Sequence, residues 1–169
     1  KAQHCFKQGQ TVSVLMNMDT PSLPLAIIGF GDELKDSAKT AINALHHLNI
    51  RTVMLSGDNA AAVKRVGDSI GIDEVFGQVL PNNKAEIIRQ LQSSGKDQSR
   101  QYVAMVGDGV NDAPALATAD VGMAMSTGTD VAMQAAGITL MRGDPSLVAD
   151  AIDISKRTWK KIQQNLFWA

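Results

Sequence analysis

The pattern of apolar and polar positions changes near residue 33, and the change predicts two kinds of structure. In residues 10–17 the apolar residues Val12, Val14 and Met16 recur at every second position, which predicts a strand with one buried face. A turn-forming run at residues 19–22 separates this strand from a second apolar run at residues 25–30. The pattern therefore predicts a β-hairpin at the start of the chain.

Beyond residue 33 the pattern predicts helices that alternate with short apolar strands. Helices are expected around residues 38–48, 62–70, 81–91, 113–117, 130–135 and from 145 to beyond 162, and strands at 52–55, 75–79, 102–106, 121–125 and 138–141. Continuous apolar strands separated by helices are typical of a parallel sheet covered on both faces. We therefore expect an α/β fold with a Rossmann-like parallel sheet, in which ligands bind at the carboxyl ends of the strands.

The composition narrows the class of protein. Hydrophobic residues make up 44% of the 169 residues, which is enough for a real core, and the formal net charge of −1 gives no sign of nucleic-acid binding. The single cysteine, Cys5, excludes an internal disulfide framework and a cysteine-based zinc cluster. The chain begins without methionine and ends as an apolar run starts at residues 165–169. We expect a piece of a larger protein, with a trimmed small protein as the alternative.

The segment with the most distinctive chemistry follows the strand expected at residues 102–106. Residues 107–112 read GDGVND, so Asp108, Asn111 and Asp112 crowd a glycine-rich turn between a strand and a helix. Carboxylate oxygens suit Mg²⁺, which binds one or two carboxylates together with phosphate and water. Asp112 could instead cap the next helix, but a cap accounts for one aspartate and not for the set. We therefore favour a metal site.

Two further positions could meet an anion. Ser56, Gly57 and Asp58 follow the strand at residues 52–55, and a hydroxyl beside the open amides of a helix start can hold a phosphate. An ordinary cap by Asp58 or Asn59 is an equally good interpretation. Lys84 lies near the start of the helix at residues 81–91, where its charge opposes the helix dipole. This poor placement suggests an anion partner, although a solvated lysine is the simpler alternative.

Taken together, these positions resemble motifs II, III and IV of the haloacid-dehalogenase superfamily. Residues 105–117, MVGDGVNDAPALA, are similar to the hinge signature of P-type ATPases, and the resemblance continues through residues 119–125 and 128–132. It covers about residues 29–169. The tail at 161–169 resembles the stalk that enters a transmembrane helix in the heavy-metal, copper-type subclass.

The resemblance implies a division of the chain into three parts. Residues 1–28 would be the C-terminal remnant of a nucleotide-binding domain, 29–157 the phosphorylation domain, and 158–169 the stalk that leads into a transmembrane helix. It also implies a membrane protein of which this segment is cytoplasmic, with Mg²⁺ bound and ATP used by the complete pump. The implied partners are the pump's own transmembrane, actuator and nucleotide-binding domains and the membrane itself, but no nucleic acid.

The resemblance also implies roles for the site residues. Asp108 would bind Mg²⁺ with support from Asp112, while Ser56 would contact the transferred phosphoryl group and Lys84 would neutralise its charge. Gly57 and Asp58 would shape the same loop as Ser56, and Asn111 would orient Asp112 or the phosphate. Phosphoryl transfer is catalysed mostly by positioning and charge stabilisation, which such groups can supply.

The chain departs from the family pattern in one serious respect. The family's nucleophile lies in an Asp-Lys-Thr-Gly-Thr run, and these 169 residues contain no such run. The central strand that leads into it is therefore absent too, and we expect the chain alone to be inactive. Two smaller departures are Ser56, where threonine is usual, and Ser126, where glycine is usual.

Two alternatives to a pump fragment stay open from the sequence. A stand-alone phosphatase of the same superfamily would need a nucleophile, for which Asp32 is the candidate, although Leu34 stands where a second aspartate is usual. A non-catalytic module could instead bind a partner through its unfinished sheet, because an exposed strand edge invites pairing.

Overall fold

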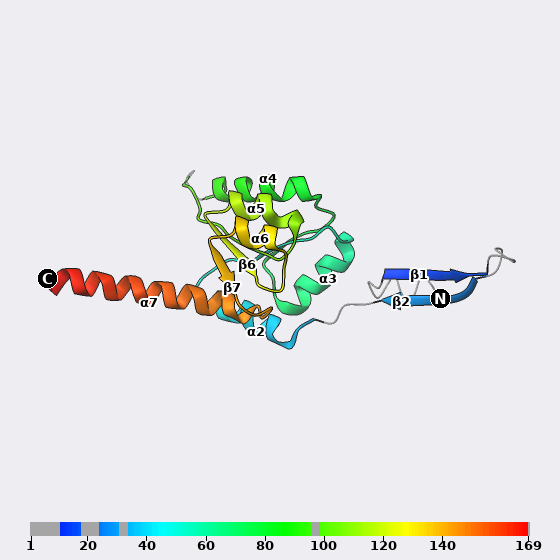
Figure 1. Cartoon of the computed structure of the whole chain (residues 1–169), viewed down its shortest axis with the longest axis horizontal. Coiled ribbons are helices and arrows are strands. Elements are labelled where there is room, and N and C mark those ends of the chain that lie inside the picture. The colour runs from blue at the N-terminus through cyan, green and yellow to red at the C-terminus, as the bar shows by residue number, and fades with distance from the viewer. Residues whose placement is uncertain (1–10, 18–23, 31–33, 96–98, 169) are drawn as a thin grey trace.

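The computed structural model describes residues 11–17, 24–30, 34–95 and 99–168. The first described element is an antiparallel pair of strands, β1 (Thr11–Met16) and β2 (Pro24–Phe30), in which Val12 lies opposite Gly29 and Val14 opposite Ile27. The predicted hairpin is therefore confirmed, while its predicted turn at 19–22 lies outside the described residues. Figure 1 shows the hairpin to one side of the α/β body.

The α/β body follows the predicted alternation of helices and strands. Its elements, in chain order, are α2 (Asp36–His47), β3 (Val53–Leu55), α3 (Ala60–Ile70), β4 (Glu74–Phe76), α4 (Pro81–Ser93), β5 (Ala104–Gly107), the short 3₁₀ helix η2 (Val110–Asp112), α5 (Ala113–Thr118), β6 (Val121–Met125), α6 (Asp130–Ala135), β7 (Ile138–Leu140) and α7 (Ser146–Trp168). Local chemistry sets several boundaries: Gly71 ends α3 with φ of 83°, and Pro81 occupies the first position of α4.

Helices cover both faces of the strands. Figure 1 shows α4, α5 and α6 on one side and α2 and α7 on the other. The two neighbouring residues Met123 and Ala124 of β6 belong to two separate apolar clusters, because successive strand residues point to opposite faces. Ala124 packs with Leu116 on the α5 side, whereas Met123 packs with Val148 on the α7 side. The predicted Rossmann-like arrangement is confirmed.

The strands form two parallel sheets rather than one continuous sheet. β3 pairs with β4, and the other sheet has the order β5-β6-β7. Within the described residues no strand pairing joins the two sheets, so β3 and β5 each have one neighbour only. One continuous parallel sheet would be divided into two such sheets if its central strand were absent.

Tertiary contacts shift some boundaries from the predicted ones. The strand expected at 75–79 ends at Phe76, because Gly77 lies against Ala60 and Gln78 takes a positive φ of 57°. The N–H of Val79 then donates to the carbonyl of Ser56 at 2.9 Å. The last helix continues to Trp168. No helix within the described ranges combines the length and the hydrophobicity needed to cross a bilayer.

Candidate functional site

The GDGVND segment forms a tight turn around the side chain of Asp112. This carboxylate is buried, and its Oδ2 accepts from the N–H of Asp108 at 3.4 Å and of Gly109 at 3.3 Å. A Cβ at Gly107 would lie 2.7 Å from the Cβ of Asp112, so a larger residue there would push the carboxylate out of place. The side chain of Asp112 therefore holds the turn together through these hydrogen bonds, and it makes no capping hydrogen bond to α5.

Lys84 supplies the counter-charge of Asp112. Its Nζ donates to Oδ1 of Asp112 at 2.6 Å, and the two side chains are only 14% and 11% exposed. The sequence predicted an anion partner for Lys84, and in the structure Asp112 is such a partner. A charged pair with so little water around it fixes the start of α4 against the loop after β5.

Asp108 has a different environment from Asp112. Its residue is exposed, and its backbone carbonyl accepts from the N–H of Thr129 at 2.8 Å. A Cβ at Gly128 would lie 2.2 Å from that carbonyl oxygen, so the Gly128–Thr129 segment holds the Asp108 loop from the side. The sequence reasoning did not single out Gly128 or Thr129 as site residues, because the contact joins segments that are far apart in the chain.

Ser56 and Asp58 form a second small loop after β3. The hydroxyl of Ser56 donates to Oδ2 of Asp58 at 2.8 Å and accepts from the N–H of Asp58 at 3.2 Å. The side chain of Asn59, and not that of Asp58, caps α3 by accepting from the N–H of Ala61 at 2.8 Å. Helix capping of α3 therefore does not involve the side chains of Ser56 and Asp58.

The Ser56 loop and Lys84 are joined through one short connection. The carbonyls of Asp58 and Ser56 accept from the N–H groups of Gln78 and Val79, at 2.8 and 2.9 Å. Val79 is buried, and α4 begins two residues later. The structure therefore ties the loop after β3 to the start of α4, and Lys84 ties α4 to the loop after β5.

The donor set suits one type of cation better than others. Among the described residues no group of three or more histidine, cysteine, aspartate or glutamate side chains could hold a metal ion. Mg²⁺ needs only one or two carboxylates when phosphate and water complete its coordination shell. Asp108 offers an exposed carboxylate, whereas both oxygens of Asp112 already accept hydrogen bonds.

The contacts described above do not include two residues that the sequence singled out, Asn111 and Asp32. The backbone of Asn111 lies in η2 and the residue is exposed. Asp32, the candidate nucleophile of a stand-alone phosphatase, lies outside the described residues. Asn111 thus lies on the same loop as Asp108.

Two carboxylates at the other end of the strands have a structural role. The N–H of Thr52, just before β3, donates to Asp73 at 2.7 Å and lowers the pKa of that carboxyl below its ordinary value. The N–H of Val103, just before β5, does the same for the pKa of Asp120, with a bond of 2.9 Å. These carboxylates fix the amino ends of the strands, away from the loops described above.

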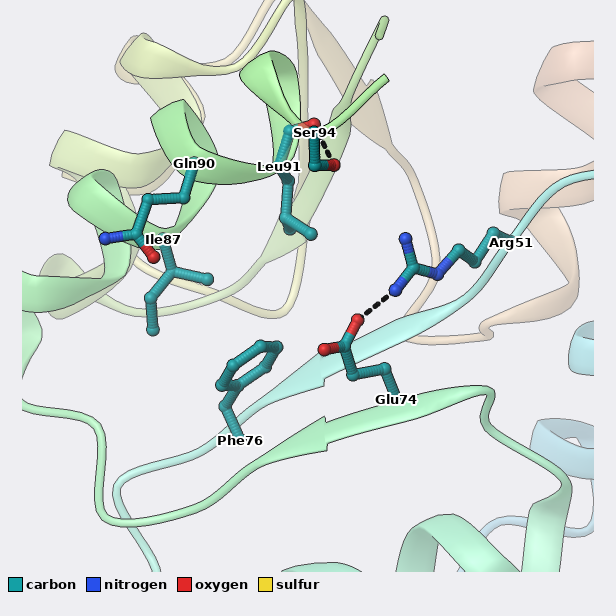
Figure 2. Close-up of a pocket in the computed structure, with 7 residues that line it drawn as sticks. All are labelled: Arg51, Glu74, Phe76, Ile87, Gln90, Leu91 and Ser94. Carbon is teal, nitrogen blue, oxygen red and sulfur yellow. Dashed lines mark hydrogen bonds and ion pairs between the residues drawn. The ribbon is translucent and has the colours of Figure 1, made fainter. Parts of the chain in front are cut away.

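A pocket of about 200 Å³ lies between α4 and the β3–β4 pair. Figure 2 shows Phe76 of β4 facing Ile87 and Leu91 of α4 across it, with the ion pair of Arg51 and Glu74 to one side. None of the site residues predicted from the sequence lines this pocket. It is a partly apolar space beside β3, on the face of the two-stranded sheet that α4 covers.

Comparison with known proteins identifies the family. The model of the family described as "haloacid dehalogenase-like hydrolase" matches residues 2–120. The match covers more than half of the chain, which therefore belongs to the haloacid dehalogenase-like hydrolases.

Similar proteins are metal-pumping P-type ATPases. The chain is 50% identical to a copper-exporting P-type ATPase of Staphylococcus saprophyticus over 143 residues, which are 85% of the chain and 17% of that protein. It is 45% identical to a copper-exporting P-type ATPase of Bacillus subtilis over 162 residues, which are 96% of the chain and 19% of that protein. The chain thus spans less than a fifth of the length of these relatives.

Solved structures agree with this similarity. The crystal structure of a zinc-transporting PIB-type ATPase matches with a TM-score of 0.81 and 34% identity, covering 97% of this chain and 26% of that one. The catalytic domain of the CPx-ATPase CopB-B matches with a TM-score of 0.61 and 28% identity, covering 85% of this chain and 57% of that one. The resemblance inferred from the motifs is confirmed.

Proposed function

We propose that this chain is the cytoplasmic phosphorylation-domain part of an ATP-driven heavy-metal transporter, with copper as the transported ion. The motifs, the fold and the similarity to copper-exporting P-type ATPases support this assignment. The proposed parts are a remnant of the nucleotide-binding domain at 1–28, the phosphorylation domain at 29–157 and a stalk at 158–169. Copper is proposed on the names of the relatives, because nothing in the site selects an ion.

The observation that carries the proposal is the linked set of Ser56, Lys84 and Asp108. Hydrogen bonds tie the Ser56 loop to the residues before α4, and the Lys84–Asp112 pair ties α4 to the Asp108 loop. A hydroxyl on the loop after β3, an ammonium group in the first turn of α4 and an exposed aspartate on the loop after β5 are thereby linked. Such groups bind a phosphoryl group and its cation in fixed positions, which is the main source of catalysis in phosphoryl transfer.

Each residue has a proposed part in this site. Asp108 binds Mg²⁺, which when bound would offset negative charge on the phosphoryl oxygens. Asp112 supports Asp108 by holding the turn that carries it and by pairing with Lys84. Lys84 neutralises charge on the phosphoryl group. The residues that complete the phosphate loop are Ser56, Gly57, Asp58 and Asn111.

The proposed site is incomplete within these residues. Neither β3 nor β5 is paired on its second side in the described structure, and the sequence has no Asp-Lys-Thr-Gly-Thr run. We propose that another segment of the same pump supplies a parallel strand between β3 and β5 and brings the nucleophile to its carboxyl end. The partners are then the pump's remaining domains, and ATP is used by the complete pump and not by this chain alone.

A titration of the ¹⁵N-labelled chain with inorganic phosphate and MgCl₂ tests the proposal. We expect the amide signals of Ser56, Gly57 and Gly109 to move together, and only weakly without MgCl₂. Asp108→Asn should remove the Mg²⁺ dependence, whereas Asp150→Asn, at an exposed position of α7, should keep it. Shifts scattered over the surface, or equal responses of the two variants, would contradict the proposed site.

A further inference from the structure

The loop after β6 lies between the Asp108 loop and the segment that precedes α7. On one side, the N–H of Thr129 donates to the carbonyl of Asp108 at 2.8 Å, and a Cβ at Gly128 would lie 2.2 Å from that carbonyl oxygen. On the other side, a Cβ at Gly143 would lie 3.0 Å from Oγ1 of Thr127. The same short loop is therefore in close contact with both of its neighbours, so a displacement on one side is felt on the other.

Lys35 holds Gly143 in place from the start of α2. Its Nζ donates to the carbonyl of Gly143, and a Cβ at Gly143 would lie 3.2 Å from the same Nζ. Lysine is a poor residue for the position just before a helix, because its side chain has no acceptor for capping and its charge opposes the helix dipole. The side chain of Lys35 therefore serves a contact across the chain and not the start of its own helix.

Asp144 joins the same two segments independently of the bond between Lys35 and Gly143. Its Oδ1 accepts from the N–H of Ser146 at 3.0 Å. This bond and the hydroxyl of the same serine lower the pKa of Asp144. A hydrogen bond from Ser37 of α2 and the charge of Lys35 lower that pKa further. Because α2 also packs against α7 (Figure 1), replacement of Lys35 alone removes the bond to Gly143 without separating the two helices.

We propose that Lys35 positions the Asp108 loop, on which it acts through Gly143 and the loop after β6. The ammonium group fixes Gly143, the backbone of Gly143 limits the space open to Thr127, and the next two residues hold the carbonyl of Asp108. The proposal rests on the function proposed for Asp108, and it adds a residue that acts through others and not by contact with the phosphate. If Lys35 only fastened α2 to α7, its loss would leave the Asp108 loop unchanged.

Amide signals of the ¹⁵N-labelled chain without any ligand test this connection. Lys35→Met should move the signals of Gly128 and Gly109. Lys39→Met, at an exposed position of the same helix, should leave both signals in place. Lys35→Arg keeps a charged donor at this position and should move both signals less than Lys35→Met does. Signals that stay in place in Lys35→Met, or that move equally in Lys39→Met, would overturn the proposal.

Gly143→Ala perturbs the same connection from its middle. The added Cβ would press on Oγ1 and Cγ2 of Thr127, at 3.0 and 3.2 Å, while the ammonium donor is kept. The same two glycine signals should therefore move in this variant as well. Gly137→Ala is the matched control, because its Cβ would meet nothing within 4 Å. Unchanged signals in Gly143→Ala, or equal shifts in the control, would also overturn the proposal.

Phosphate titrations in the presence of MgCl₂ measure the consequence for the site. Lys35→Met should weaken binding by about threefold, which is the size of effect expected of a residue that acts through others. In the background of Gly128→Ala, where the loop is already displaced, the same substitution should weaken binding little further. Full additivity of the two substitutions in the free energy of binding would overturn the proposal. Urea unfolding of Lys35→Met and Lys39→Met, which should have the same midpoint, is the check on folding.

The ligand-free and the ligand-binding readouts can fail separately. A wild-type chain that binds no phosphate would contradict the function proposed for Asp108, while the shifts in Lys35→Met need no ligand. Unmoved signals of Gly128 and Gly109 would contradict the role of Lys35 and leave the Asp108 site as proposed.

Discussion

The ammonium group of Lys84 lies 2.6 Å from Oδ1 of Asp112, and this nearly buried pair joins two segments that are 28 residues apart in the chain. Asp112 at the same time holds the turn that carries Asp108. The stability of the fold and the geometry of the proposed phosphate site therefore depend on the same ion pair.

Asp112→Ala should destabilise the protein markedly. The substitution leaves the charge of Lys84 with little water and no partner, and it removes the acceptor of two N–H groups, which together should cost about 3 kcal/mol in the free energy of unfolding. Urea unfolding measures the effect. Asp68→Ala is the control, because its pair with Lys64 is 60–72% exposed and should be worth less than about 1 kcal/mol. Equal losses for the two variants would show that burial of the Lys84 pair has no consequence.

Gly128→Ala should weaken ligand binding without changing any side chain of the site. The added Cβ would lie 2.2 Å from the carbonyl oxygen of Asp108, so the backbone of that loop must move. Phosphate binding in the presence of Mg²⁺ should fall by about tenfold or more, because small misplacements of positioned groups are costly. Calorimetry of the variant gives the affinity. Gly137→Ala is the matched control, since its Cβ would meet nothing within 4 Å, and a comparable loss there would refute the role of Gly128.

Acid should destabilise the protein partly through Asp73. Hydrogen bonds from Thr52 lower the pKa of this carboxyl in the folded state below the ordinary value of 3.8. A lowered pKa contributes stability that is fully present above about pH 4 and is lost as the pH falls toward the folded pKa. Unfolding measured at pH 6 and at pH 3 should therefore show a larger loss for the wild type than for Asp73→Asn. The same loss in both proteins would mean that other groups cause the acid sensitivity.

Much of the fold follows from local sequence signals, and the remainder depends on contacts across the chain. Gly71 and Pro81 mark helix boundaries by their own backbone preferences, so the helices were predicted closely. The end of β4 was not predicted correctly, because it depends on the contact of Gly77 with Ala60. The family resemblance predicted that the central strand is absent, but the split into two sheets was not predicted, since no apolar periodicity reveals which strands are neighbours.

The site shows the same division. Asp108 and Asp112 were selected because they crowd a glycine-rich turn between a strand and a helix, and Lys84 because its charge opposes the dipole of the helix near whose start it lies. The pairing of Lys84 with Asp112 and the support of Asp108 by Thr129 arise from tertiary structure. The division of roles between Asp58 and Asn59, of which only Asn59 caps α3, also needed coordinates, because either side chain can serve as a cap.

The most direct test measures transfer of phosphate from γ-labelled ATP in the presence of MgCl₂. The purified 169-residue chain should show no labelling and no ATP turnover. Co-expression with a separate polypeptide that carries the missing pump segments, including the Asp-Lys-Thr-Gly-Thr run, should give an acid-stable phosphoenzyme that Asp108→Ala reduces by about a hundredfold or more. Turnover of ATP by the chain alone, abolished by Asp108→Ala, would contradict the account.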